Sequence, residues 1–281
     1  MIFLILQILL LSSFGLVTKH YQALGRNMLA VGFINYAFAA FVAGLSVVYK
    51  RSFDFDYATC IIGVLAGIFY FTAFFLMITT VKFSGISITW SAIRLSVLVP
   101  ILFSILYWNE SPSIYQILGI CLVCISLLLL SIRPGIGYSR RIFSRVSILV
   151  LALFIAAGGV NLAPKAFSEI SPENHRHMYL LFLFSTAALA SGLALLPGKV
   201  KPKTVDISYG IALGLCNILA RYFLLLALER LPGIVVFPIS GSMSIVLMTI
   251  AGMVIWHERT RTLNMAGIVS AVVSVVLVNL R

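Results

Sequence analysis

Residues 85–119, GISITWSAIRLSVLVPILFSILYWNESPSIYQILG, contain landmarks that return in the second half of the chain. Gly85 is followed after 23 positions by Trp108, and then by Glu110 and Gly119. The same intervals recur 148 residues later at Gly233, Trp256, Glu258 and Gly267. A constant offset between matching landmarks indicates an internal repeat, which fixes much of the architecture.

The composition indicates a membrane protein. Of the 281 residues, 61% are hydrophobic and only 10% are charged, and the mean hydropathy is +1.10. Nearly uncharged apolar stretches of about 18 or more residues predict membrane-spanning helices, because about 20 residues at 1.5 Å rise cross the hydrocarbon core. We predict ten spans, at residues 1–18, 28–49, 57–79, 84–108, 114–132, 146–164, 178–196, 207–228, 234–256 and 263–280.

The spans divide into two sets of five. Backbone groups in lipid must pair within their own segment, and no barrel-like alternation is visible, so we expect an all-α integral membrane protein. A basic connector, residues 133–145, separates a first five-helix repeat at 1–132 from a second at 146–281. Because five is odd, the second repeat enters the membrane with opposite orientation. Ten transmembrane helices in two inverted repeats are the plan of many secondary transporters, with a site near the midplane between the repeats.

The paired pattern of glycine, Trp-x-Glu and glycine resembles the EamA-type transporters of the drug/metabolite transporter superfamily, over essentially the whole chain. The resemblance implies a multi-pass protein of the cell (inner) membrane with a central cavity. That cavity would be lined mainly by the first, third, fourth, sixth, eighth and ninth helices. It also implies alternating access and transport of small metabolites such as amino acids, nucleotide derivatives or organic anions.

The loop charges give a different orientation from the one that the resemblance implies. Counted by side, the Lys and Arg residues outside the spans favour one face by twelve to six. The positive-inside rule makes the face with twelve cytoplasmic, which puts both termini outside. The resemblance implies cytoplasmic termini, so both orientations stay open.

Arg94 is the first candidate for contact with a substrate. It lies about ten residues into its span, roughly 15 Å deep. Ser87, Trp90 and Ser91 precede it by seven, four and three positions and so share its helix face. A midplane arginine costs at least ~2.5–3.5 kcal/mol on insertion scales, so this stripe is expected to line a cavity. Alternatively, the guanidinium bonds backbone carbonyls or snorkels to the interface.

The position that matches Arg94 in the second repeat is Ser242, so the two repeats differ there. Pro238 and Gly241 lie close together in the same span, with Ser240 between them. Such a pair disfavours a continuous helix. We therefore expect exposed backbone groups that meet a substrate beside Ser240 and Ser242.

Arg221 is the second intramembrane cation, and Asn217 lies one turn before it on the same face. All eight acidic residues fall in predicted loops or at span ends. A guanidinium presents a bidentate fork to carboxylates and phosphates, so Arg94 and Arg221 are expected to bind an anionic group of the substrate. Tyr70, in an aromatic-rich span, can stack on a flat ligand group or a cation. Arg221 is nearer a span end and can instead snorkel.

Two further pairs of residues mark span ends. Lys19 and Lys165 close the first and sixth spans, where they are either interfacial anchors or gates at opposite mouths of the pathway. Glu110 and Glu258 each follow a tryptophan. We expect them to be structural, ordering a turn or pairing with nearby arginines.

The sequence argues against an enzyme. All four histidines lie in connectors, and His175 with His177 lacks the third ligand of a catalytic zinc site. A Walker-type phosphate loop is absent from the sequence, which argues against ATP-driven transport within this chain. Neither a cofactor nor a metal is expected. The basic residues lie in short connectors without interleaved aromatics, which excludes nucleic acid as an expected partner. The expected partners are the lipid bilayer and a small-molecule substrate.

These observations predict a secondary transporter of a small anionic or zwitterionic metabolite, such as an amino acid, nucleotide derivative or organic acid, working by alternating access. One alternative is efflux of cationic or aromatic compounds through an aromatic cavity. An alternative of another class is a membrane scaffold or partner subunit without transport. The deep polar stripe and the inverted repeat weigh against a scaffold, which would need neither.

Overall fold

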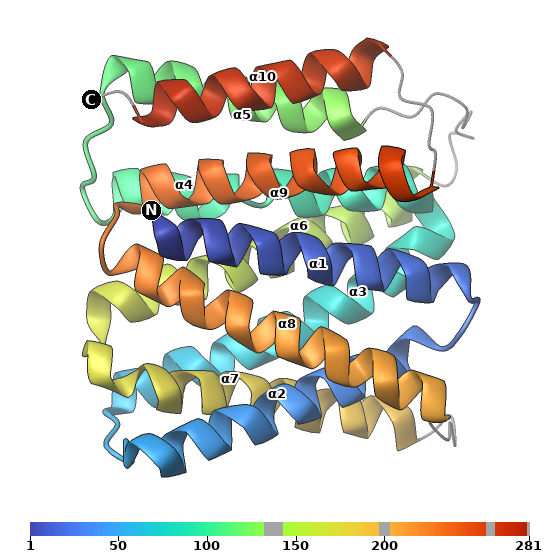
Figure 1. Cartoon of the computed structure of the whole chain (residues 1–281), viewed down its shortest axis with the longest axis vertical. Helices are drawn as coiled ribbons and strands as arrows, with labels where there is room; N and C mark the ends of the chain where they lie inside the picture. The colour runs from blue at the N-terminus through green and yellow to red at the C-terminus, as the bar shows by residue number, and fades with distance from the viewer. Residues whose placement is uncertain (132–142, 197–202, 257–261, 280–281) are drawn as a thin grey trace. The chain divides into compact units, whose positions relative to one another are not determined.

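The computed structural model describes residues 1–131, 143–196, 203–256 and 262–279. Within these ranges it describes all side chains except those of residues 84–88, 90, 91, 127–131, 143–147, 256, 262–264 and 279. The described residues form α-helices and one short 3₁₀ helix, with no strand among them (Figure 1). The predicted all-α class is confirmed. The helices are α1 (Ile2–Ala23), α2 (Met28–Lys50), α3 (Tyr57–Leu95), α4 (Leu98–Leu106), α5 (Ile114–Ser131), α6 (Phe143–Ile170), η1 (Glu173–His175), α7 (Arg176–Leu195), α8 (Thr204–Leu228), α9 (Gly233–Trp256) and α10 (Thr262–Asn279).

Seven helical stretches among the described residues are long and apolar enough to cross a membrane. They are Ile2–Ala23, Met28–Lys50, Tyr57–Phe83, Ile148–Ile170, Glu173–Leu195, Thr204–Leu228 and Gly233–Ile255. Three shorter apolar stretches are Ala92–Leu106, Ile114–Ser126 and Met265–Val278. Together these stretches coincide with the ten predicted spans, although their boundaries differ.

The largest difference concerns the predicted turn between residues 79 and 84. The structure has no turn there: α3 continues for 39 residues to Leu95, and the helix breaks at Ser96 and Val97 instead. Pro100 explains the position of the break, because it has no N–H to donate to the carbonyl of Ser96. That carbonyl accepts from the N–H of Val99 at 3.1 Å. The prediction of a turn at 79–84 was wrong because the sequence there contains no residue that forbids helix.

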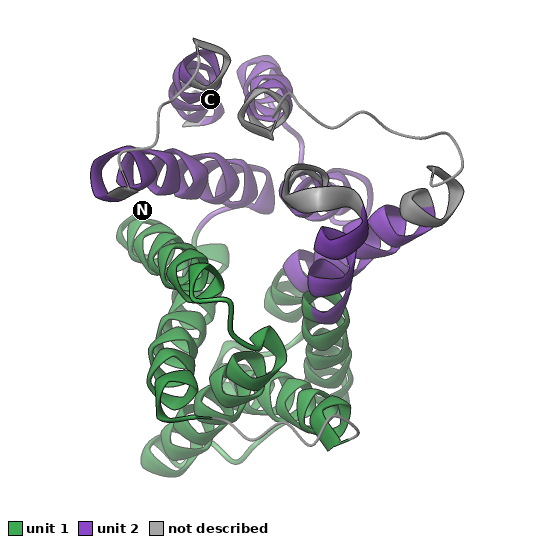
Figure 2. Ribbon diagram, turned by 90° about the vertical axis from the view of Figure 1, so that its right-hand side faces the viewer, with its two compact units in different colours: residues 1–74, 163–230 green, residues 75–162, 231–281 purple. Residues whose placement is uncertain are grey.

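The chain forms two compact units, coloured separately in Figure 2. Unit 1 consists of residues 1–74 and 163–230, and unit 2 of residues 75–162 and 231–281. Both α3 and α6 contribute to both units. The units therefore do not follow the sequence halves 1–132 and 146–281, whose description as two repeats with a connector at 133–145 stays a prediction.

Close helix packing in unit 1 depends on glycine. In this unit α2 packs against α7 and α8, and α1 packs against α8. A Cβ added at Gly214 of α8 would lie 2.8 Å from the carbonyl oxygen of Asn35. A Cβ at Gly67 of α3 would lie 2.6 Å from Cβ of Thr186 in α7. Only glycine permits these approaches, as is common where helices pack in membranes.

In unit 2, α5 lies beside α10, and α9 packs against α4 and α10 (Figure 1). Gly119 lets α5 approach α10, because an added Cβ would lie 2.6 Å from Cγ2 of Val278. Glu110 caps the N-terminus of α9: its carboxylate accepts hydrogen bonds from the N–H groups of Gly233 and Ile234, each at 2.9 Å. This is the structural role expected for Glu110. Glu258 and the arginines beside it lie outside the described residues.

Candidate functional site

Arg221 and Tyr70 form the centre of a candidate site in unit 1. Arg221 lies seven residues before the end of α8, or about 10 Å along the helix axis. Its guanidinium carbon is 4.9 Å from the centre of the Tyr70 ring of α3, which is the geometry of a cation–π interaction. Tyr70 is 6% exposed. The guanidinium is thus directed onto a buried ring of the protein, whereas a snorkelling arginine would extend toward the head groups.

Other aromatic rings hold Tyr70 in place. The ring of Tyr36 meets it edge-on with centroids 6.2 Å apart, and the ring of Phe184 does so at 6.0 Å. The hydroxyl of Tyr36 donates to the backbone carbonyl of Tyr70 at 3.4 Å. These contacts join α2, α3 and α7 around one tyrosine. Tyr36 was not predicted as a site residue, because nothing in the sequence relates it to Tyr70.

An amide pair lies one helical turn from Arg221. Asn217 Nδ2 donates to Oδ1 of Asn35 in α2 at 3.3 Å, and both residues are buried. The pair is brought together by the close approach of α2 and α8 at Gly214. The predicted site residues Arg221, Asn217 and Tyr70 therefore belong to the same unit, and Asn217 and Arg221 lie on one helix face.

The charges around Arg221 are unusual for a half-buried arginine in a membrane-spanning helix. Among the residues that the structure describes, no carboxylate forms an ion pair with it. The ion pairs described in unit 1 include Asp206 with Arg26, Glu169 with Lys165, Asp56 with His175, and Arg176 with Glu173 and Glu229. An arginine that is largely removed from water and has no ion-paired carboxylate among the described residues is costly, so Arg221 stays a candidate for contact with a charged ligand.

The remaining predicted binding residues lie in unit 2. Arg94 is half-buried in the last turn of α3. The backbone of residues 87–91 is helical, but the side chains of Ser87, Trp90 and Ser91 are outside the described set. The stripe that they were predicted to form with Arg94 stays a prediction.

The expected interruption near Ser240 and Ser242 is absent, because α9 is helical from Gly233 to Trp256. Both serines are buried. The hydroxyl of Ser242 donates to the carbonyl of Pro238 at 2.6 Å. Proline can be accommodated inside membrane helices, and Pro238 does not interrupt α9. The prediction of exposed backbone in this stretch is therefore wrong, and the serines as substrate contacts stay a prediction.

The two lysines predicted at span ends differ in their surroundings. Lys19 lies near the end of α1, as predicted. Lys165 lies inside α6, which continues to Ile170, and it is 1% exposed and paired with Glu169. Burial of its ammonium disfavours the role of interfacial anchor for Lys165.

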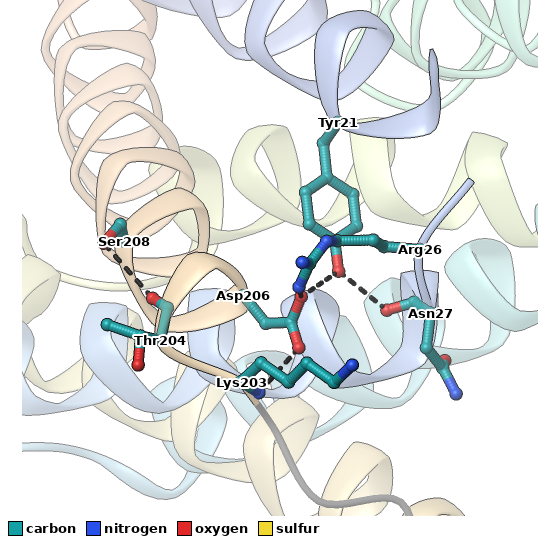
Figure 3. Close-up of polar contacts among 7 residues, drawn as sticks. All are labelled: Tyr21, Arg26, Asn27, Lys203, Thr204, Asp206 and Ser208. Atoms are coloured by element: carbon teal, nitrogen blue, oxygen red, sulfur yellow. Dashed lines mark hydrogen bonds and ion pairs between the residues drawn. The ribbon is translucent and has the colours of Figure 1, made fainter. Parts of the chain in front are cut away.

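The N-terminal end of α8 is fixed by a polar cluster that sequence reasoning missed (Figure 3). Asp206 Oδ1 accepts from the hydroxyl of Tyr21 at 2.9 Å and from Nη1 of Arg26 at 3.1 Å. Its Oδ2 accepts from the backbone N–H of Lys203 at 2.7 Å. The cluster ties the α1–α2 turn to α8, across about 180 residues of sequence.

The C-terminal end of α8 is held by Arg176, at the start of α7. Its guanidinium is 2.9 Å from a carboxylate oxygen of Glu229 and lies 6.0 Å from the ring centre of Tyr222. Burial raises the pKa of Glu229 above its ordinary value, and Arg176 opposes that shift. Both ends of α8, the helix that carries Arg221, are thus anchored within unit 1.

Beside Arg176 in α7, Nδ1 of His177 is 3.1 Å from Oγ of Ser46 in α2.

Comparison with known proteins identifies the relatives of this chain. A model of the EamA-like transporter family matches residues 1–132. An uncharacterized protein of Haemophilus influenzae is 30% identical over 201 residues, which are 70% of this chain and 68% of that protein. A solved structure described only as the crystal structure of a protein superposes with a TM-score of 0.77 at 16% identity, covering 99% of this chain and 95% of that one. At this identity the likeness shows the fold alone.

The apolar helices and the family match define the class as a multi-pass membrane transporter. More particularly, the chain belongs to the EamA-like transporter family. This membership agrees with three predictions from the sequence: the family resemblance, the lack of an enzymatic role and the location in the cell membrane.

Proposed function

We propose that the protein is a secondary transporter that moves a small anionic or zwitterionic metabolite across the membrane by alternating access. Amino acids, nucleotide derivatives and organic acids are the candidate substrates. One observation supports the proposal. Arg221, in a membrane-spanning helix, lies over the buried ring of Tyr70, and no carboxylate among the described residues forms an ion pair with Arg221. A carboxylate or phosphate of the substrate would supply the missing counter-charge in a bidentate geometry. Arg94 is proposed as a second anion-binding residue.

Efflux of cationic or aromatic compounds is the second candidate. The aromatic rings of Tyr36, Tyr70, Phe74 and Phe184 favour it, because such rings bind cations and flat molecules. The guanidinium of Arg221 opposes it, since a cationic ligand on Tyr70 would meet a like charge.

Counterflow in liposomes containing the purified protein tests the proposal. A ligand-stabilisation screen first selects the anions that raise the thermal unfolding midpoint, because a bound ligand stabilises the folded state by mass action. Arg221→Ala should reduce counterflow of those anions at least tenfold, and Arg221→Lys should reduce it less. Arg230, which follows the end of α8, is the matched control, because its guanidinium also lies over an aromatic ring, 4.7 Å from the ring centre of Phe3. Arg230→Ala should transport normally.

The outcomes separate the candidate functions. If Arg221→Ala folds and transports every anionic substrate at the normal rate, the assignment of Arg221 is wrong, and the same criterion applies to Arg94→Ala. If only cationic or aromatic compounds exchange, efflux is the function. Absence of counterflow for any metabolite, together with binding of a partner subunit, would favour the scaffold.

A further inference from the structure

The hydroxyl of Tyr70 has no function in the packing of unit 1. The hydroxyl oxygen is buried and has no hydrogen-bond partner among the described residues. A buried polar group normally has a partner, because leaving it without one costs free energy. A phenylalanine would make the same ring contacts with Tyr36, Phe184 and Arg221. The hydroxyl therefore calls for an explanation outside the fold.

The guanidinium of Arg221 over the same ring distinguishes this hydroxyl from others that are buried. Tyr179, also in unit 1, has a buried hydroxyl without a partner, but its ring stacks on Phe167 at 4.5 Å. Tyr70 instead has a guanidinium carbon 4.9 Å from its ring centre. A small ligand whose carboxylate binds Arg221 can therefore also reach the hydroxyl at the edge of the same ring.

We propose that the Tyr70 hydroxyl donates a hydrogen bond to a second oxygen of the bound anion. The preferred substrates are then organic acids that carry a hydroxyl or carbonyl oxygen beside the carboxylate, that is, 2-hydroxy or 2-oxo acids. This inference rests on the proposed function, in which Arg221 binds the carboxylate. Tyr70 becomes a residue that determines specificity among anions.

The charge of Arg221 also discriminates between an oxygen and an amino group at that position. A phenol can donate to an oxygen or accept from an ammonium. The ammonium of an α-amino acid, however, would lie close to a guanidinium of like charge, and like charges disfavour each other's charged forms. The same site therefore favours a 2-hydroxy acid over the α-amino acid with the same carbon skeleton.

A matched series of ligands tests the inference. The probes are a 2-hydroxy acid, the unsubstituted carboxylate and the α-amino acid on one skeleton, such as lactate, propionate and alanine, with longer homologues. Binding and counterflow are measured for the natural protein and for Tyr70→Phe, with Tyr179→Phe as the matched control. The natural protein should prefer the hydroxy acid over the unsubstituted acid about tenfold, the effect of one hydrogen bond.

Tyr70→Phe should abolish that preference by weakening only the hydroxy acid about tenfold, with the unsubstituted acid within twofold. Its thermal unfolding midpoint without ligand should be equal to or higher than that of the natural protein, because a buried unpaired hydroxyl is removed. Tyr179→Phe should leave the preference intact.

Two results would overturn the inference while leaving anion transport in place: equal affinity of the natural protein for both acids, or equal weakening of both by Tyr70→Phe. The first needs no variant, so the test holds even if Tyr70→Phe fails to fold. Failure of the natural protein to bind any anion would instead contradict the proposed function itself.

Discussion

The carboxylate of Glu110 caps the first turn of α9 by accepting the N–H of Gly233, 123 residues further along the chain. Its second oxygen accepts the N–H of Ile234. The first N–H groups of a helix have no partner within the helix, and the helix dipole favours negative charge there. The connection between α4 and α5 thus supplies what the start of α9 lacks, and it explains why a glutamate follows Trp108.

Replacing Glu110 by alanine should lower the free energy of unfolding by about 1–2 kcal/mol, because both capping bonds and the favourable charge are lost. Glu110→Gln should cost less, since an amide oxygen still accepts one bond. Thermal unfolding in detergent measures both. Glu173→Ala is the control, since that side chain is 70% exposed. Equal midpoints for Glu110→Ala and the natural protein would contradict the cap.

Asn217→Asp should inhibit anion transport at least tenfold. The new carboxylate lies one turn before Arg221, and opposite charges four residues apart on a helix attract. The new carboxylate would form an ion pair with the guanidinium of Arg221, and it would thereby compete with the anionic group of the substrate. Asn217→Leu removes the same amide without adding charge and should reduce counterflow less. If the two variants transport equally, the charge of Arg221 is not what the substrate requires.

Asp206→Ala should destabilise the protein by about 2–4 kcal/mol. It removes a helix-capping carboxylate and leaves the buried hydroxyl of Tyr21 without its carboxylate partner. Ser208 provides a control from the same turn, because its exposed hydroxyl donates to the carbonyl of Thr204 in its own helix, at 3.2 Å. Ser208→Ala should change the unfolding midpoint little. A similar midpoint for both variants would show that the polar cluster does not stabilise the fold.

Gly67→Ala should destabilise unit 1 by about 1–3 kcal/mol through overpacking. The added methyl would lie 2.5 Å from the carbonyl oxygen of Leu183 and 2.6 Å from Cβ of Thr186. Gly44→Ala is a matched control in α2, because its methyl would meet only Cδ1 of Leu181, at 3.8 Å. That variant should be as stable as the natural protein or slightly more stable. Comparison of the two midpoints tests whether α3 and α7 pack as closely as the structure has them.

Asp56 makes stability depend on pH at the start of α3. The hydrogen bond from the Thr59 side chain lowers the pKa of Asp56 below its ordinary value. Its stabilising contribution is therefore fully present above the unfolded-state pKa of about 3.9, and it is lost as the pH falls through the lower folded-state pKa. Asp56→Asn keeps a capping side chain without the charge. The variant should be less stable than the natural protein at pH 6, and the difference should shrink as the pH falls below the unfolded-state pKa of about 3.9. A difference that does not change with pH would contradict this assignment.

The sequence predicts the helical class well because the signal is local. Each apolar stretch is long enough to recognise by itself, and the stretches found among the described residues match the predicted spans. The boundaries are predicted less well. The predicted break between residues 79 and 84 is absent, and α3 instead ends at Leu95, because Pro100 has no N–H to donate to the carbonyl of Ser96.

The candidate site is only partly predictable. Arg221 is recognisable because a charge within an apolar stretch is rare. Its contact with Tyr70 joins residues 151 positions apart, and the partner of Asp206 is 185 positions away. Such pairs depend on which helices pack together, and one sequence contains no periodicity that specifies it. Tyr36 and the Tyr21 cluster were missed for the same reason.

The interleaving of the two units has a consequence for biosynthesis. Asn35 in α2 bonds Asn217, which is translated 182 residues later. At about 5–20 residues per second, roughly 9–36 s pass between their synthesis. During that interval α2 must reside in the membrane with a polar amide that has not yet met its native partner. Unit 1 is completed only when α8 has left the ribosome, so truncation before the end of α8 would leave the first helices inserted but unassembled.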